Sequence, residues 1–187
     1  MIQSHFPAKR QRGTSLIEVL VTIVILAIGL LGLAGLQVRL QSSEMEAYQR
    51  AQALVLLNDM ASRMAANRIS AATYDTGVTP LGGTAVCPTT TATRQQMDAG
   101  EWCNALKGAG ETLGANNVGA MVGGRGCVAD LGGGEYLVTI AWQGMTPISA
   151  PLPTCGQNLY NGAAGSNCSG DLCRRVITTV VRVGNLT

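Results

Sequence analysis

Few side chains in this sequence could carry out acid–base catalysis. The chain has 187 residues and one histidine, His5, which lies among the first 13 residues. Histidine is the usual general base and metal ligand near neutral pH, and no paired acids stand out elsewhere. Asn167 and Asp171 offer two oxygen side chains, whereas calcium needs about six to eight ligands. We therefore expect no enzymatic activity, no catalytic residue, no cofactor and no metal site.

The cysteines are a second chemical feature, and they indicate the compartment. None of them forms a C-x-x-C pair of the kind found in zinc or redox sites, so oxidised pairs fit better than six free thiols in a cytosolic protein. We expect three disulfides in an extracytoplasmic domain. Cys87 with Cys103 is the favoured pair, and the pairing of the other four stays open. The six cysteines are Cys87, Cys103, Cys127, Cys155, Cys168 and Cys173.

An apolar segment near the N-terminus contains a single charge. Residues 16–36 are 21 residues whose only ionisable side chain is Glu18. As a helix they would span roughly 31 Å, the thickness of a bilayer core. Lys9, Arg10 and Arg12 precede the segment and place the N-terminus in the cytoplasm by the positive-inside rule. We expect a retained transmembrane helix rather than a cleaved secretory signal, because the apolar run is longer than such signals need.

Glu18 needs an explanation, because a carboxylate within a membrane helix costs about 2.5–3.5 kcal/mol on insertion scales. One explanation is local: Ser15-Leu16-Ile17-Glu18 has the S-x-x-E spacing of a capping box, and an acid in the first turn complements the helix dipole. The other is a charge pair with another group. The order of elements favours the second, because a short basic leader ending at Gly13 precedes the apolar run.

The sequence from Gly13 to Leu20 resembles the start of type IV pilins. The resemblance implies that a prepilin peptidase cuts between Gly13 and Thr14 and methylates the new amine of Thr14. It also implies that Glu18, the fifth residue after the cut, pairs with an N-terminal amine during filament assembly. Thr14 stands where the family usually has phenylalanine. The run from Gly29 to Gln37, together with Asp59-Met60 and residues 63–68, looks more narrowly like a minor pilin of a type IV pilus.

This resemblance also implies partners and a location. The partners would be the prepilin peptidase, the major pilin, other minor pilins and the pilus assembly platform, and the role would be priming of pilus assembly. The chain would be a single-pass protein of the bacterial inner membrane, and after assembly it would lie on the extracellular surface in the pilus. A minor pseudopilin of a type II secretion system is the alternative. Beyond residue 13 there are 10 basic and 11 acidic residues, so we expect no nucleic-acid partner.

The expected fold is α+β: a long N-terminal helix, the pilin stalk, packed on a small antiparallel sheet with disulfides. We expect a leader at residues 1–13, the transmembrane half of the helix at 14–37, its amphipathic half at 38–69 and an extracytoplasmic head at 70–187. No proline interrupts residues 8–79, so the helix can continue to about Arg68. The apolar stripe of its amphipathic half should be Ala53, Leu54, Leu57, Met60, Ala61 and Met64.

The head has the composition of turns and short strands, since residues 70–187 hold 20 of the 24 glycines. Thr93 and Gln96 have capping-box spacing and predict a short helix to about Lys107. Runs rich in β-branched residues predict strands over 125–130, 135–143 and 174–183, the first two joined as a hairpin. The long connection 144–173 should be held by its cysteines.

Overall fold

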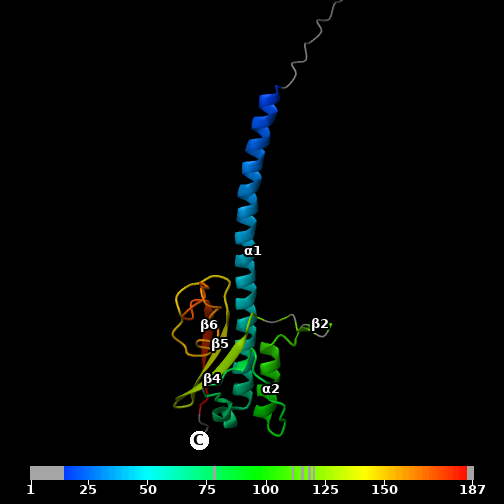
Figure 1. Ribbon diagram of the computed structural model, residues 1–187. Helices are drawn as coiled ribbons and strands as arrows, with labels where there is room; N and C mark the ends of the chain where they lie inside the picture. Colours follow the sequence, from blue (N-terminus) through cyan, green and yellow to red (C-terminus); the bar gives the residue numbers. More distant parts are fainter. Residues whose placement is uncertain are drawn as a thin grey trace, which may run out of the picture. The chain divides into compact units, whose positions relative to one another are not determined.

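The computed structural model describes residues 15–77, 79–110, 112–114, 116–117, 119 and 121–184. The chain divides into two compact units, residues 1–43 and 44–187, which are described separately below. Helix α1, Leu16–Ala66, contributes to both (Figure 1). Its 51 residues confirm the expected long helix, and its end at Ala66 lies close to the expected one. A 3₁₀ helix, η1, follows at Arg68–Tyr74, and no sequence pattern had indicated it.

In the second unit, α1 has one buried face. The buried residues recur at helical spacing, and they pack against the sheet and against α2. Leu54, which the predicted stripe included, is 41% exposed, so that prediction was wrong. Residue 54 is one position beyond Ala53, and 100° of helix rotation turns its side chain away from the core. The buried face consists of Gln49, Ala53, Leu57, Met60 and Met64.

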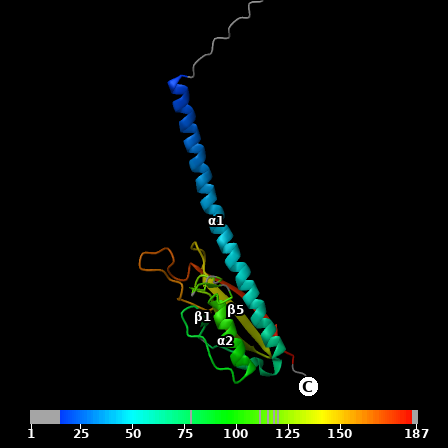
Figure 2. The ribbon, with the colours of Figure 1, turned by 90° about the vertical axis from the view of Figure 1, so that its right-hand side faces the viewer.

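A four-stranded antiparallel sheet in the order β1-β4-β5-β6 forms the centre of this unit (Figures 1 and 2). Strands β4, Arg125–Gly132, and β5, Glu135–Gln143, form the expected hairpin, with an irregularity between Asp130 and Gly132. Strand β6, Arg174–Arg182, pairs with β5 along its length. Strand β1, Leu81–Gly82, has two residues, too few to show a pattern in the sequence. A separate two-stranded pair consists of β2, Thr112–Leu113, and β3, Asn116–Asn117.

Different parts of the chain pack against the two faces of the sheet. Val128, Tyr136, Val138, Ile140 and Trp142 lie in the same apolar cluster as the buried face of α1. The opposite face carries a smaller cluster of Cys127, Ala141, Cys155 and Tyr160, to which the connection between β5 and β6 contributes. Successive residues of a strand point to opposite faces, which explains this division.

Helix α2, Arg94–Leu106, begins as its sequence predicts. The Thr93 hydroxyl accepts a hydrogen bond from the backbone N–H of Gln96 at 3.2 Å, and the Gln96 side chain accepts one from the Thr93 N–H at 3.3 Å. Both bonds of the capping box are therefore present. The indole N–H of Trp102 donates to the carbonyl of Leu56 at 2.9 Å, which fixes α2 to α1.

A charged network joins the same two helices. Arg63 of α1 donates to Asp59 at 3.0 Å, to Asp98 at 2.9 Å and to Glu101 at 2.5 Å. Burial disfavours its charge, but the hydrogen bonds with these carboxylates outweigh that effect and raise the pKa of Arg63. Burial, and then the hydrogen bond to Asp98, raise the pKa of Tyr74. The Tyr74 hydroxyl donates to Asp98 at 2.5 Å, so the buried carboxylate has several partners.

Three disulfides are present, as the expected fold requires. Cys87 pairs with Cys103 of α2, which is the pair favoured from the sequence. Cys127 of β4 pairs with Cys155, and Cys168 pairs with Cys173. The bond between Cys127 and Cys155 attaches the connection 144–173 to the sheet.

A buried arginine organises the rest of that connection. Arg174, which is 1% exposed, donates through its guanidinium to the carbonyls of Pro151, Pro153 and Cys155. Its Nε lies 3.3 Å from a carboxylate oxygen of Asp171. Arginine has five donors in a fixed fork, so one side chain can bind several loop carbonyls at once.

Gly126 provides a test of the core. A Cβ atom at this position in β4 would overlap the ring of Trp102 at distances that real contacts do not show. We expect Gly126→Ala to lower the free energy of unfolding by about 1–3 kcal/mol, because overpacking forces neighbours off their rotamers. A Cβ added at Gly110 would meet no atom within 4 Å, so Gly110→Ala is the control. Chemical denaturation of both variants gives the comparison, and equal stability of Gly126→Ala and wild type would contradict this packing.

Candidate functional site

The first turn of α1 contains the residues that the sequence singled out. The Ser15 hydroxyl accepts a hydrogen bond from the N–H of Glu18 at 3.3 Å, and the Ser15 carbonyl accepts from Glu18 at 3.0 Å and from Val19 at 3.3 Å. Ser15 therefore acts as the N-cap of the helix. Within residues 15–77 and the other described segments, no group binds the carboxylate of Glu18. The amide of Glu18 is used in capping, whereas no described residue pairs with its charge.

The helix around Glu18 is apolar and exposed. Helix α1 is long and apolar enough to cross a membrane by length and composition, and none of its most apolar window is buried within the structure. Leu16, Ile17 and Leu20 are among the exposed side chains. Exposed apolar surface of this extent normally faces lipid or another protein. By length and composition, a helix of this kind could anchor the chain in a membrane.

Three glycines interrupt the apolar surface of this helix. Gly29, Gly32 and Gly35 have no atom within 4 Å of the position of an added Cβ. Each lowers helix propensity by up to about 1 kcal/mol relative to alanine. The spacing is not G-x-x-x-G, so the specific motif for close helix dimers is absent from residues 29–35.

The predicted cleavage and methylation positions, Gly13 and Thr14, lie outside the described residues. Their roles therefore remain predictions from the sequence. The described helix begins at Leu16, so the proposed cut lies one residue before the N-cap Ser15.

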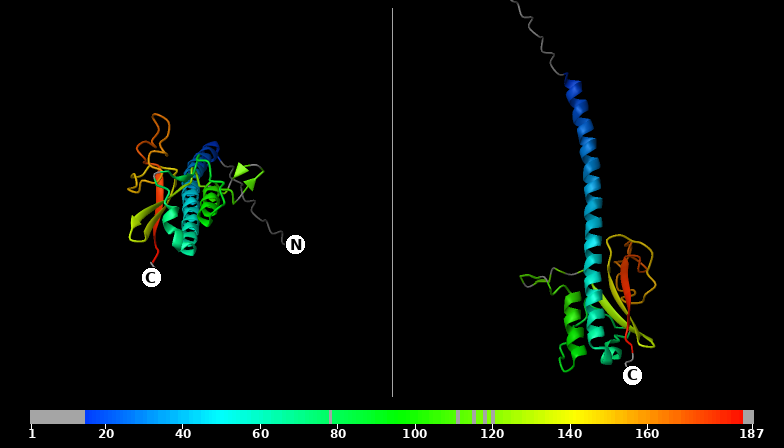
Figure 3. Two further views of the ribbon diagram at one scale, coloured as in Figure 1. Left: turned by 90° about the horizontal axis from the view of Figure 1, so that it is seen from below. Right: turned by 180° about the vertical axis from the view of Figure 1, so that it is seen from behind.

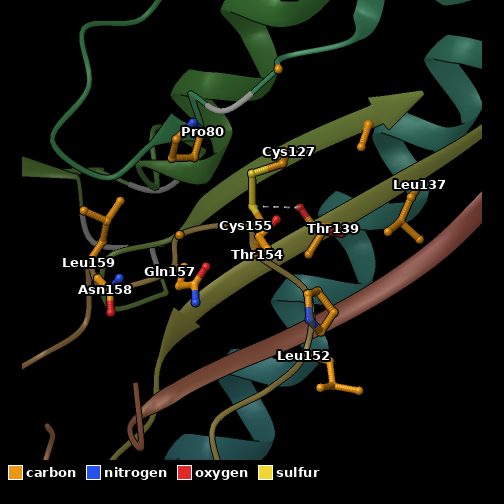
Figure 4. A pocket seen from close by; sticks show the side chains of 14 residues that line it. Pro80, Cys127, Leu137, Thr139, Leu152, Thr154, Cys155, Gln157, Asn158 and Leu159 are labelled. Carbon is orange, nitrogen blue, oxygen red and sulfur yellow. Dashed lines mark hydrogen bonds between the residues drawn. A yellow bond between two sulfur atoms is a disulfide. The ribbon is translucent and has the colours of Figure 1, made fainter. Parts of the chain in front are cut away.

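The face of the sheet that carries the smaller cluster of Cys127 and Cys155 is called the outer face here. A cavity of about 620 Å³ lies on this outer face (Figure 4). Leu137 and Thr139 of β5 form its floor, and Leu152 and Leu159 of the connection 144–173 line its side. The Cys127–Cys155 disulfide crosses it, and the sulfur of Cys155 lies 3.8 Å from the carbonyl oxygen of Thr139. None of the described lining residues can ionise at neutral pH, so the cavity offers no side chain for general acid or base catalysis.

Asp171 has a structural role. Its carboxylate accepts two bonds from the backbone N–H of Asn158, at 2.8 and 3.0 Å, and lies beside Arg174. Both oxygens are thus engaged by the Asn158 N–H of the same loop, and one of them also by Arg174 of β6. Among the described residues, no group of three or more histidine, cysteine or acidic side chains could hold a metal ion.

Tyr160 and Arg125 form the other polar contact on this face. The Arg125 guanidinium lies 4.8 Å from the centre of the Tyr160 ring, and the Tyr160 hydroxyl donates to the carbonyl of Gly123 at 2.9 Å. Burial raises the pKa of Tyr160, although the nearby charge of Arg125 acts in the opposite direction. A cation above an aromatic face stabilises the packing.

Comparison with known proteins identifies the N-terminal segment. Residues 8–34 match the family model of the prokaryotic N-terminal methylation motif. The match includes Gly13, Thr14 and Glu18, and it implies that the chain is a substrate of prepilin peptidase. No curated protein and no solved structure matches the chain. Together with the helix packed on a four-stranded sheet, the motif supports a protein similar to type IV pilins or pseudopilins.

The motif leads to a prediction about processing. We expect cleavage between Gly13 and Thr14, which leaves a chain of 174 residues. Gly13→Leu should block cleavage, because a bulky side chain replaces the glycine that the resemblance places at the cut. Intact-mass spectrometry of the membrane fraction measures both chains, and Gly29→Leu, which lies beyond the cut, is the control. An unchanged mature N-terminus in Gly13→Leu would contradict the assignment.

Proposed function

We propose that this chain is a minor pilin subunit of a type IV pilus, which takes part in priming pilus assembly together with other minor pilins and the major pilin. The observation that carries the proposal is Glu18: an acid whose carboxylate binds none of the described residues, in an exposed apolar helix, within a methylation motif. A free-standing membrane-anchored domain would need the helix but would gain nothing from this charge. In a filament, an N-terminal amine would neutralise it.

The second half of α1 supports assembly into a bundle of helices. Its buried face packs in its own unit, and the opposite side also carries apolar residues that remain exposed, among them Ala47, Ala51, Leu54 and Val55. Leu54 is 41% and Val55 63% exposed. A helix with two apolar sides is typical of a position between a core and a neighbouring protein. Helices of adjacent subunits would cover the second side.

The resemblance over residues 29–68 favours the pilus and, more narrowly, the minor pilin PilV. A minor pseudopilin of a type II secretion system is the alternative, because it shares the leader, the glutamate and the helix packed on a sheet. In either system the chain would be inserted in the inner membrane through α1, with the unit 44–187 outside the cytoplasm, where its disulfides would persist. The assembly platform would then move it into the filament. We propose no enzymatic activity for it.

The charge of Glu18 can be separated from its capping position. Glu18→Gln keeps the backbone N–H that binds Ser15 but removes the charge that would pair with an amine. Ser15→Ala does the reverse, with an expected loss of about 1 kcal/mol in helix capping. We expect Glu18→Gln to be cleaved and inserted normally but to fall at least about tenfold in sheared filaments, because an unpaired buried amine costs several kcal/mol.

Immunoblots of the membrane and sheared fractions measure this difference, with Ser15→Ala as the matched control. Recovery of Glu18→Gln at the wild-type level would show that assembly does not need the charge. An equal loss in both variants would point to capping as the requirement.

The two filament systems give different results in assembly mutants. In cells that lack the secretion assembly ATPase, we expect to find the chain in the sheared surface material. In cells that lack the pilus assembly ATPase, we expect it to be absent from that material. Peptide mass spectrometry of the sheared material detects it. The reverse pattern would establish the pseudopilin alternative.

A further inference from the structure

Strand β6 has a long free edge. It is the outermost strand of the sheet, drawn in red in the right-hand view of Figure 3. Its nine residues contrast with the two residues of β1 at the other edge. Its pairing with β5 runs from Arg174–Gln143 to Arg182–Glu135 without a register shift. It contains no proline. The strand is therefore straight enough along its outer side to accept a further strand.

The hydrogen bonds at its two ends show which backbone groups point outward. Val183 donates to the carbonyl of Gly134 at 2.8 Å, and Gly144 donates to the carbonyl of Cys173 at 2.7 Å. Both pairs follow the register of the β5–β6 ladder. Backbone groups alternate in direction along a strand, so the odd-numbered residues bond to β5. The N–H and C=O groups of Val176, Thr178 and Val180 therefore point away from the sheet.

These six outward groups have no hydrogen-bond partner in the part of the chain that the structure describes. Most proteins protect such an edge with a charged side chain, a proline or a bulge in the middle of the strand. The segment from Val176 to Val181 has none of these. An edge without protection is a ready template for another strand, and main-chain hydrogen bonds would supply the affinity.

Side chains on the outer face continue to this edge. Ala129, Leu137 and Val180 are aligned across β4, β5 and β6 by the two registers. Val180 at the end of this row is 45% exposed. An added strand would place a side chain next to Val180 and extend the row by one residue. The residue that fits there is apolar.

The charge at the end of β6 limits the partner further. The side chain of Arg182 is 79% exposed and contacts Glu135 at 2.7 Å. An acid opposite Arg182 would add a second favourable cross-strand contact. Strand β6 has no acidic residue, so a second copy of this strand cannot provide that acid in any register. The antiparallel self-pairing centred on Thr178 would even place Arg182 opposite Arg174 of the second copy.

We propose that the free edge of β6 binds an extended strand of a different polypeptide, with apolar residues opposite Val176, Thr178 and Val180 and an acid opposite Arg182. The added strand becomes the fifth strand of the sheet, after β6. Binding of this kind does not depend on whether the chain belongs to a pilus or to a secretion pseudopilus.

The test uses the full mature chain in detergent micelles and the peptide acetyl-Glu-Thr-Val-Thr-Val-Thr-Val-amide. In antiparallel pairing its glutamate faces Arg182 and its valines face Val180, Thr178 and Val176. NMR of the ¹⁵N-labelled protein measures amide hydrogen exchange. We expect the three outward amides to exchange about tenfold or more slowly at saturating peptide, because an amide must be released from its hydrogen bond before it exchanges. The amides of Ile177 and Thr179 already bond to β5 and serve as internal references.

Two control peptides and two variants test the geometry. A peptide with N-methylated valines lacks the donors and should not bind, and a peptide with lysine for glutamate should bind about two- to fivefold more weakly. The N–H of Thr178 points outward and does not bond to β5, so Thr178→Pro removes it without breaking the ladder. Proline is tolerated at such edge positions. Thr178→Pro should abolish binding, whereas Thr178→Val should retain it. If Thr178→Pro fails to fold, the N-methylated peptide still decides the question.

Three outcomes would overturn the proposal. The first is unchanged exchange of the outward amides at saturating peptide. The second is binding of the N-methylated peptide as strongly as the parent peptide, which would place the contact on side chains alone. The third is protection of these amides without peptide that rises with protein concentration, which would show that a second copy occupies the edge.

Discussion

The packing of residues 44–184 depends on one indole ring. Trp102 is fully buried, its N–H binds the carbonyl of Leu56 in α1, and its ring fills the space that Gly126 leaves in β4. The neighbouring residue, Cys103, binds the preceding loop through Cys87. Helix, sheet and loop thus meet at two consecutive residues of α2.

The elements that could be predicted are those with local signals. Thr93 and Gln96 fix the start of α2 through bonds within one turn, and the β-branched runs of β5 and β6 match strands that the structure contains. A membrane helix is recognisable because about twenty apolar residues in a row leave few alternatives. The buried face of α1 could be predicted only approximately, because one residue of error, as at Leu54, changes the side of a helix.

The elements that could not be predicted depend on contacts between distant residues. In the sequence, Arg174 is simply a charged residue at the start of a strand. In the structure it is buried, and its guanidinium binds carbonyls more than 18 positions away in the sequence. Arg63 meets Asp98 across 35 positions, and nothing near either residue indicates the other. Glu18 is different, since both its capping position and its unusual place in an apolar run are visible locally. This explains why the N-terminal segment was more predictable than the loops of the head.

The disulfide connectivity affects how the chain can fold. Each cysteine pairs with the next one in the sequence: Cys87 with Cys103, Cys127 with Cys155 and Cys168 with Cys173. No bond encloses or crosses another. A chain that emerges from its N-terminal side therefore presents every cysteine with its native partner before any later thiol arrives. Simple sequential oxidation produces the native set, and the slow reshuffling of wrong pairs, which limits the folding of many disulfide proteins, is not needed.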